Sequence, residues 1–231
     1  GARGLAHIGV LKSFQNHGIP ISKISGTSIG AFVGGLYAVF RDASKVEDFI
    51  YDFVGKEDFV ELNLDAFDPA PNDKQGYLKT FLNTAYKNLS IFRSWRHQSM
   101  LSNEQVEKIF SFYPNDNIED LAINTGIDFA AVTTDLISGR ETILSSGSLR
   151  QAVLASSSIP GIFPPVKMLG TLMCDGGVAD LVPVYVSRSR GAQLVVAVDV
   201  TKSLNEQEDL SNGLKIIDRA QSIRSYQLSR E

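Results

Sequence analysis

The strongest structural signal in this chain is the stretch Gly26-Thr27-Ser28-Ile29-Gly30. It follows residues 21–25, which can form a short strand, and it leads into a nearly uninterrupted apolar helix over residues 29–40. A strand, a sharp turn and a buried helix in this order are typical of a G-x-S-x-G nucleophile elbow, in which the turn exposes the serine hydroxyl. Gly26 and Gly30 fit this interpretation because the positions that flank the serine must be small. The alternative is a glycine-rich tight turn in which the serine has no chemical role.

Strand and helix patterns alternate along the rest of the chain. We expect helices over residues 5–17, 44–54, 102–112, 148–159 and 210–228, and strands over residues 127–134, 141–144, 166–169, 171–174 and 193–200. The helix that ends at residue 54 should start from a capping box formed by Ser44 and Glu47. The run 193–200 is apolar throughout, which is typical of a strand buried on both faces. The alternation predicts an α/β fold, a three-layer sandwich with a mainly parallel central sheet.

The length of 231 residues favours a single domain over residues 1–231. Residues 56–101 are less regular and indicate a variable insertion over the body of that domain. The chain opens on a turn at residues 1–4, directly followed by a helical pattern, so we expect a further strand upstream of Gly1. The apolar helix over residues 29–40 is too short to span a membrane.

Composition excludes several classes of protein. The only cysteine is Cys174, which rules out an internal disulfide scaffold and a CxxC metal site. A formal net charge of −4 supplies no general cationic field, so we expect no nucleic-acid partner.

A serine nucleophile needs a base, and the histidines of this chain are badly placed to supply one. In an α/β hydrolase the catalytic histidine follows the nucleophile and the acid, whereas here no histidine follows His97. His17 lies at a helix end, where an imidazole commonly binds terminal carbonyls, and His97 lies in a basic loop. We interpret these two and His7 as structural or surface residues.

Asp175 is the best-placed alternative base. It follows a hydrophobic strand and precedes Gly176 and Gly177, which allow other backbone to approach closely. Apolar surroundings would raise the pKa of its carboxyl group. The other interpretation of Asp-Gly-Gly is a tight turn after a hairpin strand.

Four motifs, in order, resemble those of the bacterial patatin-like phospholipase family. Residues 1–11 look like the end of its G-G-G-x-R-G loop and its first helix, and residues 26–30 look like its elbow. Residues 155–166 look like the block that precedes the base hairpin, and residues 175–177 look like the D-G-G base motif. Residues 56–101 match nothing in the family pattern.

This resemblance implies a serine esterase with a catalytic dyad, Ser28 as nucleophile and Asp175 as base, and no metal or cofactor. The oxyanion hole would be formed by backbone N–H groups around Gly1, Ala2, Arg3, Gly4 and Ile29. Arg3 could stabilise this region or hold a lipid phosphate, or it could be a surface residue at a helix start.

The resemblance further implies a phospholipid, lysophospholipid or other fatty acyl ester as substrate. Residues 91–97 mix aromatic and cationic side chains, as an interfacial loop would, although such a loop can also pack on the body. We therefore expect a cytoplasmic or peripheral membrane protein with possible contact to a membrane surface. Two alternatives stay open: an acyltransferase on the same fold, and a catalytically silent regulatory protein.

Overall fold

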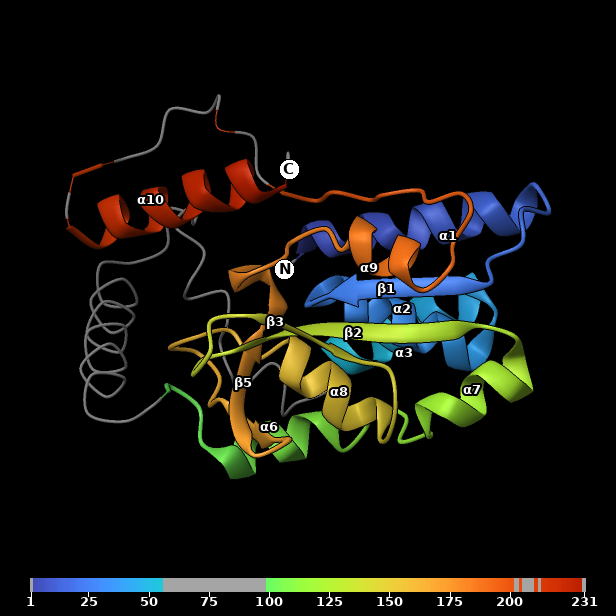
Figure 1. Ribbon diagram of the computed structural model, residues 1–231, viewed down its shortest axis with the longest axis horizontal. Helices are drawn as coiled ribbons and strands as arrows, with labels where there is room; N and C mark the ends of the chain where they lie inside the picture. The colour runs from blue at the N-terminus through green and yellow to red at the C-terminus, as the bar shows by residue number, and fades with distance from the viewer. Residues whose placement is uncertain (1, 56–98, 202–203, 205–209, 212, 230–231) are drawn as a thin grey trace.

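The computed structural model describes residues 2–55, 99–201, 204, 210–211 and 213–229 (Figure 1). The expected insertion at 56–101 lies almost wholly outside the described residues, as do the aromatic and cationic segment 91–97 and His97. Within the described ranges, no helix is both long and apolar enough to cross a membrane.

The centre of the fold is a five-stranded sheet in the order β1-β2-β5-β4, with β3 also paired to β2. Its strands are β1 (Lys23–Thr27), β2 (Asp128–Asp135), β3 (Glu141–Leu144), β4 (Val166–Met168) and β5 (Thr171–Asp175). Among the described strands, only β1 and β2 pair in parallel, and the other three pairs are antiparallel. The sheet is therefore mixed, and the prediction of a mainly parallel sheet is wrong. The reason is that short connections join β2 to β3 and β4 to β5, and strands joined by such turns must be antiparallel.

The strand expected at residues 193–200 does not form. This segment pairs with no strand in the described part of the chain, and the side chains of Leu194 and Val196 are 85% and 54% exposed. It lines one side of a groove of about 1140 Å³, and β1 lines another side. An apolar run becomes a strand only beside a hydrogen-bonding neighbour, and here the groove separates it from β1, the nearest edge of the sheet.

The helices are α1 (Ala6–Asn16), α2 (Ile29–Phe40), α3 (Ala43–Val54), α6 (Asn103–Phe110), α7 (Ile118–Thr125), α8 (Leu149–Ser156), α9 (Val184–Ser189) and α10 (Gly213–Leu228). Two 3-10 turns, η1 (Ala2–Leu5) and η3 (Gly176–Val178), precede α1 and follow β5. The sequence did not predict α7 and α9. With six residues, α9 is too short to show a clear period.

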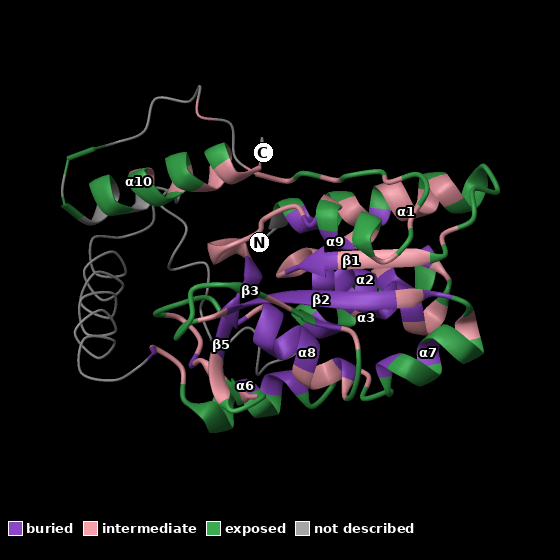
Figure 2. Cartoon of the chain, viewed as in Figure 1, coloured by how far each residue is buried: buried purple, intermediate pink, exposed green. Residues whose placement is uncertain are grey.

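Helices cover both faces of the sheet (Figure 1). Along β2, Phe129 and Ala131 belong to the large core formed with α2 and α8, while Ala130 and Val132 pack with Val186 of α9. The whole middle of β2 is consequently buried (Figure 2). This arrangement confirms the prediction of a three-layer α/β sandwich.

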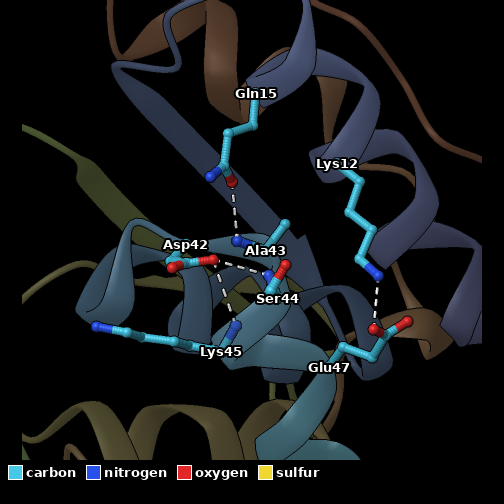
Figure 3. Close-up of polar contacts among 7 residues, drawn as sticks. All are labelled: Lys12, Gln15, Asp42, Ala43, Ser44, Lys45 and Glu47. Atoms are coloured by element: carbon cyan, nitrogen blue, oxygen red, sulfur yellow. Dashed lines mark hydrogen bonds and ion pairs between the residues drawn. The ribbon is translucent and has the colours of Figure 1, made fainter.

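The start of α3 differs in detail from the prediction (Figure 3). The N-cap is Asp42, whose Oδ1 accepts from the backbone N–H groups of Ser44 (2.9 Å) and Lys45 (3.4 Å). Glu47, expected to complete a capping box, forms an ion pair with Lys12 of α1 instead. The N-cap lies two residues earlier than predicted, because Asp42 precedes Ser44 and caps the helix first.

Candidate active site

The register of the sheet brings Ser28 and Asp175 together. Thr27, the last residue of β1, lies opposite Val132 of β2, and Asp175, the last residue of β5, lies opposite Thr133 on the other side of β2. Ser28 follows Thr27 directly. The two motifs are 147 positions apart in the sequence, but both leave the sheet beside adjacent residues of one buried strand.

Ser28 occupies a strained turn between β1 and α2. Its backbone angles are φ 53° and ψ −119°, which a residue with a side chain rarely adopts. A Cβ at Gly26 would lie 2.5 Å from backbone atoms of Gly30 and Ala31, so only glycine fits there. At Gly30 an added Cβ would meet only Nε2 of His7, at 3.6 Å, which is an ordinary contact. The elbow is confirmed as a strand-turn-helix, but side-chain volume explains Gly26 and not Gly30.

Asp175 is a buried carboxylate with two hydrogen-bond donors. Its side chain accepts from the Gly177 N–H (N···O 2.7 Å) and from the side chain of Ser28, and the residue is 7% exposed. Burial raises the pKa of this carboxyl group, and the two hydrogen bonds oppose the shift. A Cβ at Gly176 would lie 2.2 Å from the carbonyl oxygen of Val132, so this glycine lets the chain turn tightly over β2.

Residues at and just after the end of α8 bind the backbone N–H groups of Ser28 and Asp175. The Ser28 N–H donates to Oγ of Ser156 (2.9 Å), and that hydroxyl donates to the carbonyl of Val132 (2.6 Å). Two residues later, the carbonyl of Ser158 accepts from the Asp175 N–H (2.9 Å). The sequence marked the block 155–166 only through its resemblance to a family motif, and nothing in it assigned a role to Ser156.

The segment expected to form the oxyanion hole lies against the elbow. A Cβ at Gly4 would lie 2.1 Å from Cγ1 of Ile29, so the backbone of η1 touches the residue that follows Ser28. Arg3 is exposed, and Gly1 lies outside the described residues. The structure thus brings Gly4 and Ile29 together, as expected, with η1 and the N-terminus of α2 side by side.

Two of the three histidines are described. Nδ1 of His17 lies 2.8 Å from the carbonyl oxygen of Ser13, which confirms its place at the end of α1. His7 lines the groove together with Ser28, and its Nδ1 lies 3.0 Å from the carbonyl oxygen of Gly4. Burial lowers the pKa of His7, so a neutral ring is favoured. His7 is therefore a partly buried neighbour of the elbow rather than a surface residue.

A second acidic residue lies beside the elbow. Thr27 Oγ1 donates to the carbonyl of Asp180 (3.0 Å), and the Asp180 N–H donates to the carbonyl of Gly176 (2.8 Å). Burial, and then the neighbouring carboxylate of Glu141, raise the pKa of Asp180 to about 6. No sequence signal singled out this residue. Among the described residues, no group of three or more histidine, cysteine, aspartate or glutamate side chains is arranged to hold a metal ion.

Comparison with known proteins agrees with this geometry. The family model described as "Patatin-like phospholipase" matches residues 1–187. The chain belongs to the patatin-like phospholipase family. Its fold is therefore the patatin fold, and the resemblance inferred from the four sequence motifs is confirmed.

Relatives in this family are much longer than the chain. "Patatin-like phospholipase domain-containing protein 7" of Rattus norvegicus is 32% identical over 214 residues, which are 92% of this chain and 14% of the relative. "Lysophospholipase NTE1" of Candida glabrata is 31% identical over 201 residues, 87% of this chain and 10% of the relative. The crystal structure of VipD from Legionella pneumophila aligns with a TM-score of 0.46 and 15% identity, over 78% of this chain and 45% of that one.

Proposed function

We propose that this patatin-like chain hydrolyses fatty acyl esters, with Ser28 as the nucleophile and Asp175 as its base. The observation that supports this most directly is the contact between the Ser28 side chain and the buried Asp175 carboxylate at the elbow. A carboxylate removed from water holds a proton more readily than an exposed one, so it is suited to accept the serine proton and return it.

In the proposed reaction, Oγ of Ser28 attacks the ester carbonyl while Asp175 takes its proton. Asp175 then gives that proton to the leaving alcohol, and an acyl-serine ester remains. A water molecule, deprotonated by Asp175, attacks this ester, and the proton returns to Ser28 as the fatty acid leaves. The leaving oxygen of an ester needs less help from a general acid than the leaving nitrogen of an amide, so we expect esters rather than amides as substrates.

The negative charge that develops on the carbonyl oxygen needs donors close to Ser28. We assign this role to backbone N–H groups of residues 1–4 and of Ile29, because η1 lies against Ile29 at the N-terminus of α2. Helix N-termini carry partial positive charge, which favours an oxyanion there.

The substrate class follows from the relatives. Their names include phospholipase and lysophospholipase, so we propose a phospholipid or lysophospholipid as the acyl donor. Such substrates lie in membranes or micelles, and we accordingly propose contact with a membrane surface and either a cytoplasmic or a peripheral membrane location.

The test uses Ser28→Ala and Asp175→Asn, with Ser13→Ala and Asp116→Asn as controls at exposed positions of the same residue types outside the groove. Hydrolysis of a short-chain ester and of lysophospholipid micelles, together with labelling by a fluorophosphonate, would be measured. We expect each site variant to lose activity by ~10³-fold or more, and the double variant to be scarcely worse, because the two residues act as one unit. Normal turnover in Asp175→Asn would contradict the dyad, and a wild-type protein that neither labels nor hydrolyses would be a silent regulatory protein.

A further inference from the structure

Ser156 is a fully buried serine that is not among the residues that line the groove. Its side chain has no exposed surface and lies at the C-terminal end of α8, behind the elbow. Its hydroxyl accepts from the Ser28 N–H at 2.9 Å and donates to the Val132 carbonyl at 2.6 Å. One hydroxyl thus joins the elbow backbone to the middle of the sheet, at the residue that pairs with Thr27.

The Ser28 N–H has no partner in regular secondary structure. Ser28 lies between β1 and α2 with a positive φ of 53°, and its own carbonyl already accepts from the Phe32 N–H at the start of α2. A backbone conformation of this kind persists only when the surroundings hold it in place. If the N–H of Ser28 lost its acceptor, it would be unsatisfied inside the protein, and the turn would gain by rotating toward another conformation.

We propose that Ser156 is a positioning residue that keeps the Ser28 hydroxyl aimed at Asp175 and at the ester carbonyl. This inference rests on the proposed function of Ser28. Ser156 acts through the backbone of Ser28, and it takes no part in proton transfer. The segment that directly follows α8 binds the other half of the site, since the carbonyl of Ser158 accepts from the Asp175 N–H. The end of α8 therefore sets the position of both residues against one strand.

Ser158 provides a matched control for the hydroxyl. It lies two residues further along the chain at the same depth, and its Oγ donates to the carbonyl of Leu154 in α8. Removing the hydroxyl of Ser158 deletes one buried hydrogen bond, as in Ser156, but leaves the contact to Ser28 intact. The backbone contact between Ser158 and Asp175 does not depend on the side chain.

The experiment compares Ser156→Ala with Ser158→Ala at a temperature well below the Tm of both variants. We expect Ser156→Ala to lower kcat for a short-chain ester by ~10- to 100-fold, with KM within about twofold, because a small displacement of a nucleophile costs rate rather than binding. The rate constant of fluorophosphonate labelling should fall by the same factor, and the apparent pKa of the pH profile should stay the same. Ser158→Ala should keep kcat within about threefold.

Equal kcat and labelling rates in the two variants would overturn the proposal. If Ser156→Ala does not fold, Ser156→Cys replaces it, because a thiol fills nearly the same space but is a weak hydrogen-bonding group. The cysteine variant should then be slowed several-fold relative to Ser158→Ala, and an unchanged rate would reject the role of the hydroxyl. Full activity in Ser28→Ala would instead reject the proposed function itself, so the two failures are distinguishable.

Discussion

Asp175 illustrates how a buried charge at a functional site lowers stability. Burial raises its folded-state pKa, so the folded protein binds a proton more tightly there than the unfolded chain does. Folding stability therefore falls as the pH rises from the unfolded pKa through the raised folded pKa. We expect Asp175→Asn to raise the Tm at pH 8 and to raise it much less at pH 4. Thermal denaturation at both pH values, with Asp116→Asn as control, measures this; an equal change in Tm at both would contradict it.

Asp180 should show the same sign, with a neighbouring carboxylate adding to the effect of burial. Its pKa of about 6 reflects burial and, in addition, the repulsion from Glu141. Above pH 6 the Asp180 carboxyl is mostly charged, so Glu141→Gln should raise the Tm at pH 7.5 by removing that repulsion. Near pH 4 Asp180 is protonated in the folded state, and the effect of the substitution should shrink. The exposed Glu107→Gln is the control; a destabilised Glu141→Gln variant at pH 7.5 would show that this carboxylate has another favourable partner.

Substitution of the histidines distinguishes a Ser-Asp dyad from a catalytic triad that contains a histidine. His7→Gln, His17→Gln and His97→Gln should each keep kcat within about tenfold, because losing a true general base costs 10²-fold or more. His7 is the critical case, since it lines the groove beside Ser28 and its lowered pKa favours a neutral ring. A folded His7→Gln variant that loses ~10³-fold in kcat would make His7 part of the proton transfer, and the mechanism would have to be rewritten.

Among the secondary-structure elements, the start of α3 gives a direct test of a local prediction. Asp42 caps this helix, so Asp42→Ala should lower stability by about 1 kcal/mol. Ser44→Ala is the matched control, because the sequence made Ser44 the cap whereas the structure uses only its backbone N–H. Urea denaturation measures both. A larger loss for Ser44→Ala than for Asp42→Ala would support the capping box that the sequence predicted.

The elements that the sequence predicted well depend on neighbouring residues alone. The apolar period of α2, the cap at Ser148 of α8 and the hairpin turn at Gly170, where φ is +80°, are all local signals. The errors in the sheet, the strand expected at 193–200 and the mainly parallel pairing, concern how strands pair with one another. An apolar run such as 193–200 does not reveal its neighbour, and strand direction in a mixed sheet depends on connections that the pattern of one segment cannot show.

In the candidate site, too, the sequence reveals residues in local motifs but not residues whose role depends on contacts between distant segments. Ser28 and Asp175 could be found because each lies in a glycine-rich motif whose backbone geometry restricts the sequence. Ser156 could not be found in this way, since a buried serine at a helix end looks like any other helical serine. Its importance depends on the register of β1 against β2, which places the Val132 carbonyl and the Ser28 N–H on either side of its hydroxyl.

At the scale of the whole molecule, the main feature is the groove between β1 and residues 193–200. Among the described residues β1 pairs only with β2, and the segment 193–200 has no strand partner, yet both run in the same direction along the groove (Figure 1). Unpaired strand edges and exposed apolar side chains such as Leu194 favour the addition of a strand between them. We expect a strand-forming segment joined upstream of Gly1 to occupy this groove, because η1 lies against Ile29, just beyond the carboxyl end of β1.

An extension of ~6 residues rich in valine and isoleucine, the usual length of a strand, should therefore raise both the Tm and the specific activity. The Tm rises because backbone hydrogen bonds and apolar area are buried between β1 and residues 193–200. The activity rises because the added strand, paired in the sheet, would hold the backbone N–H groups of η1 in place beside Ser28. A glycine and serine extension of equal length is the control, and it should change neither quantity. Equal Tm and activity in the two extended proteins would show that the groove takes no strand. A rise in Tm with loss of hydrolysis would show instead that the groove holds the acyl chain, since Ser28 and Asp175 lie in its wall.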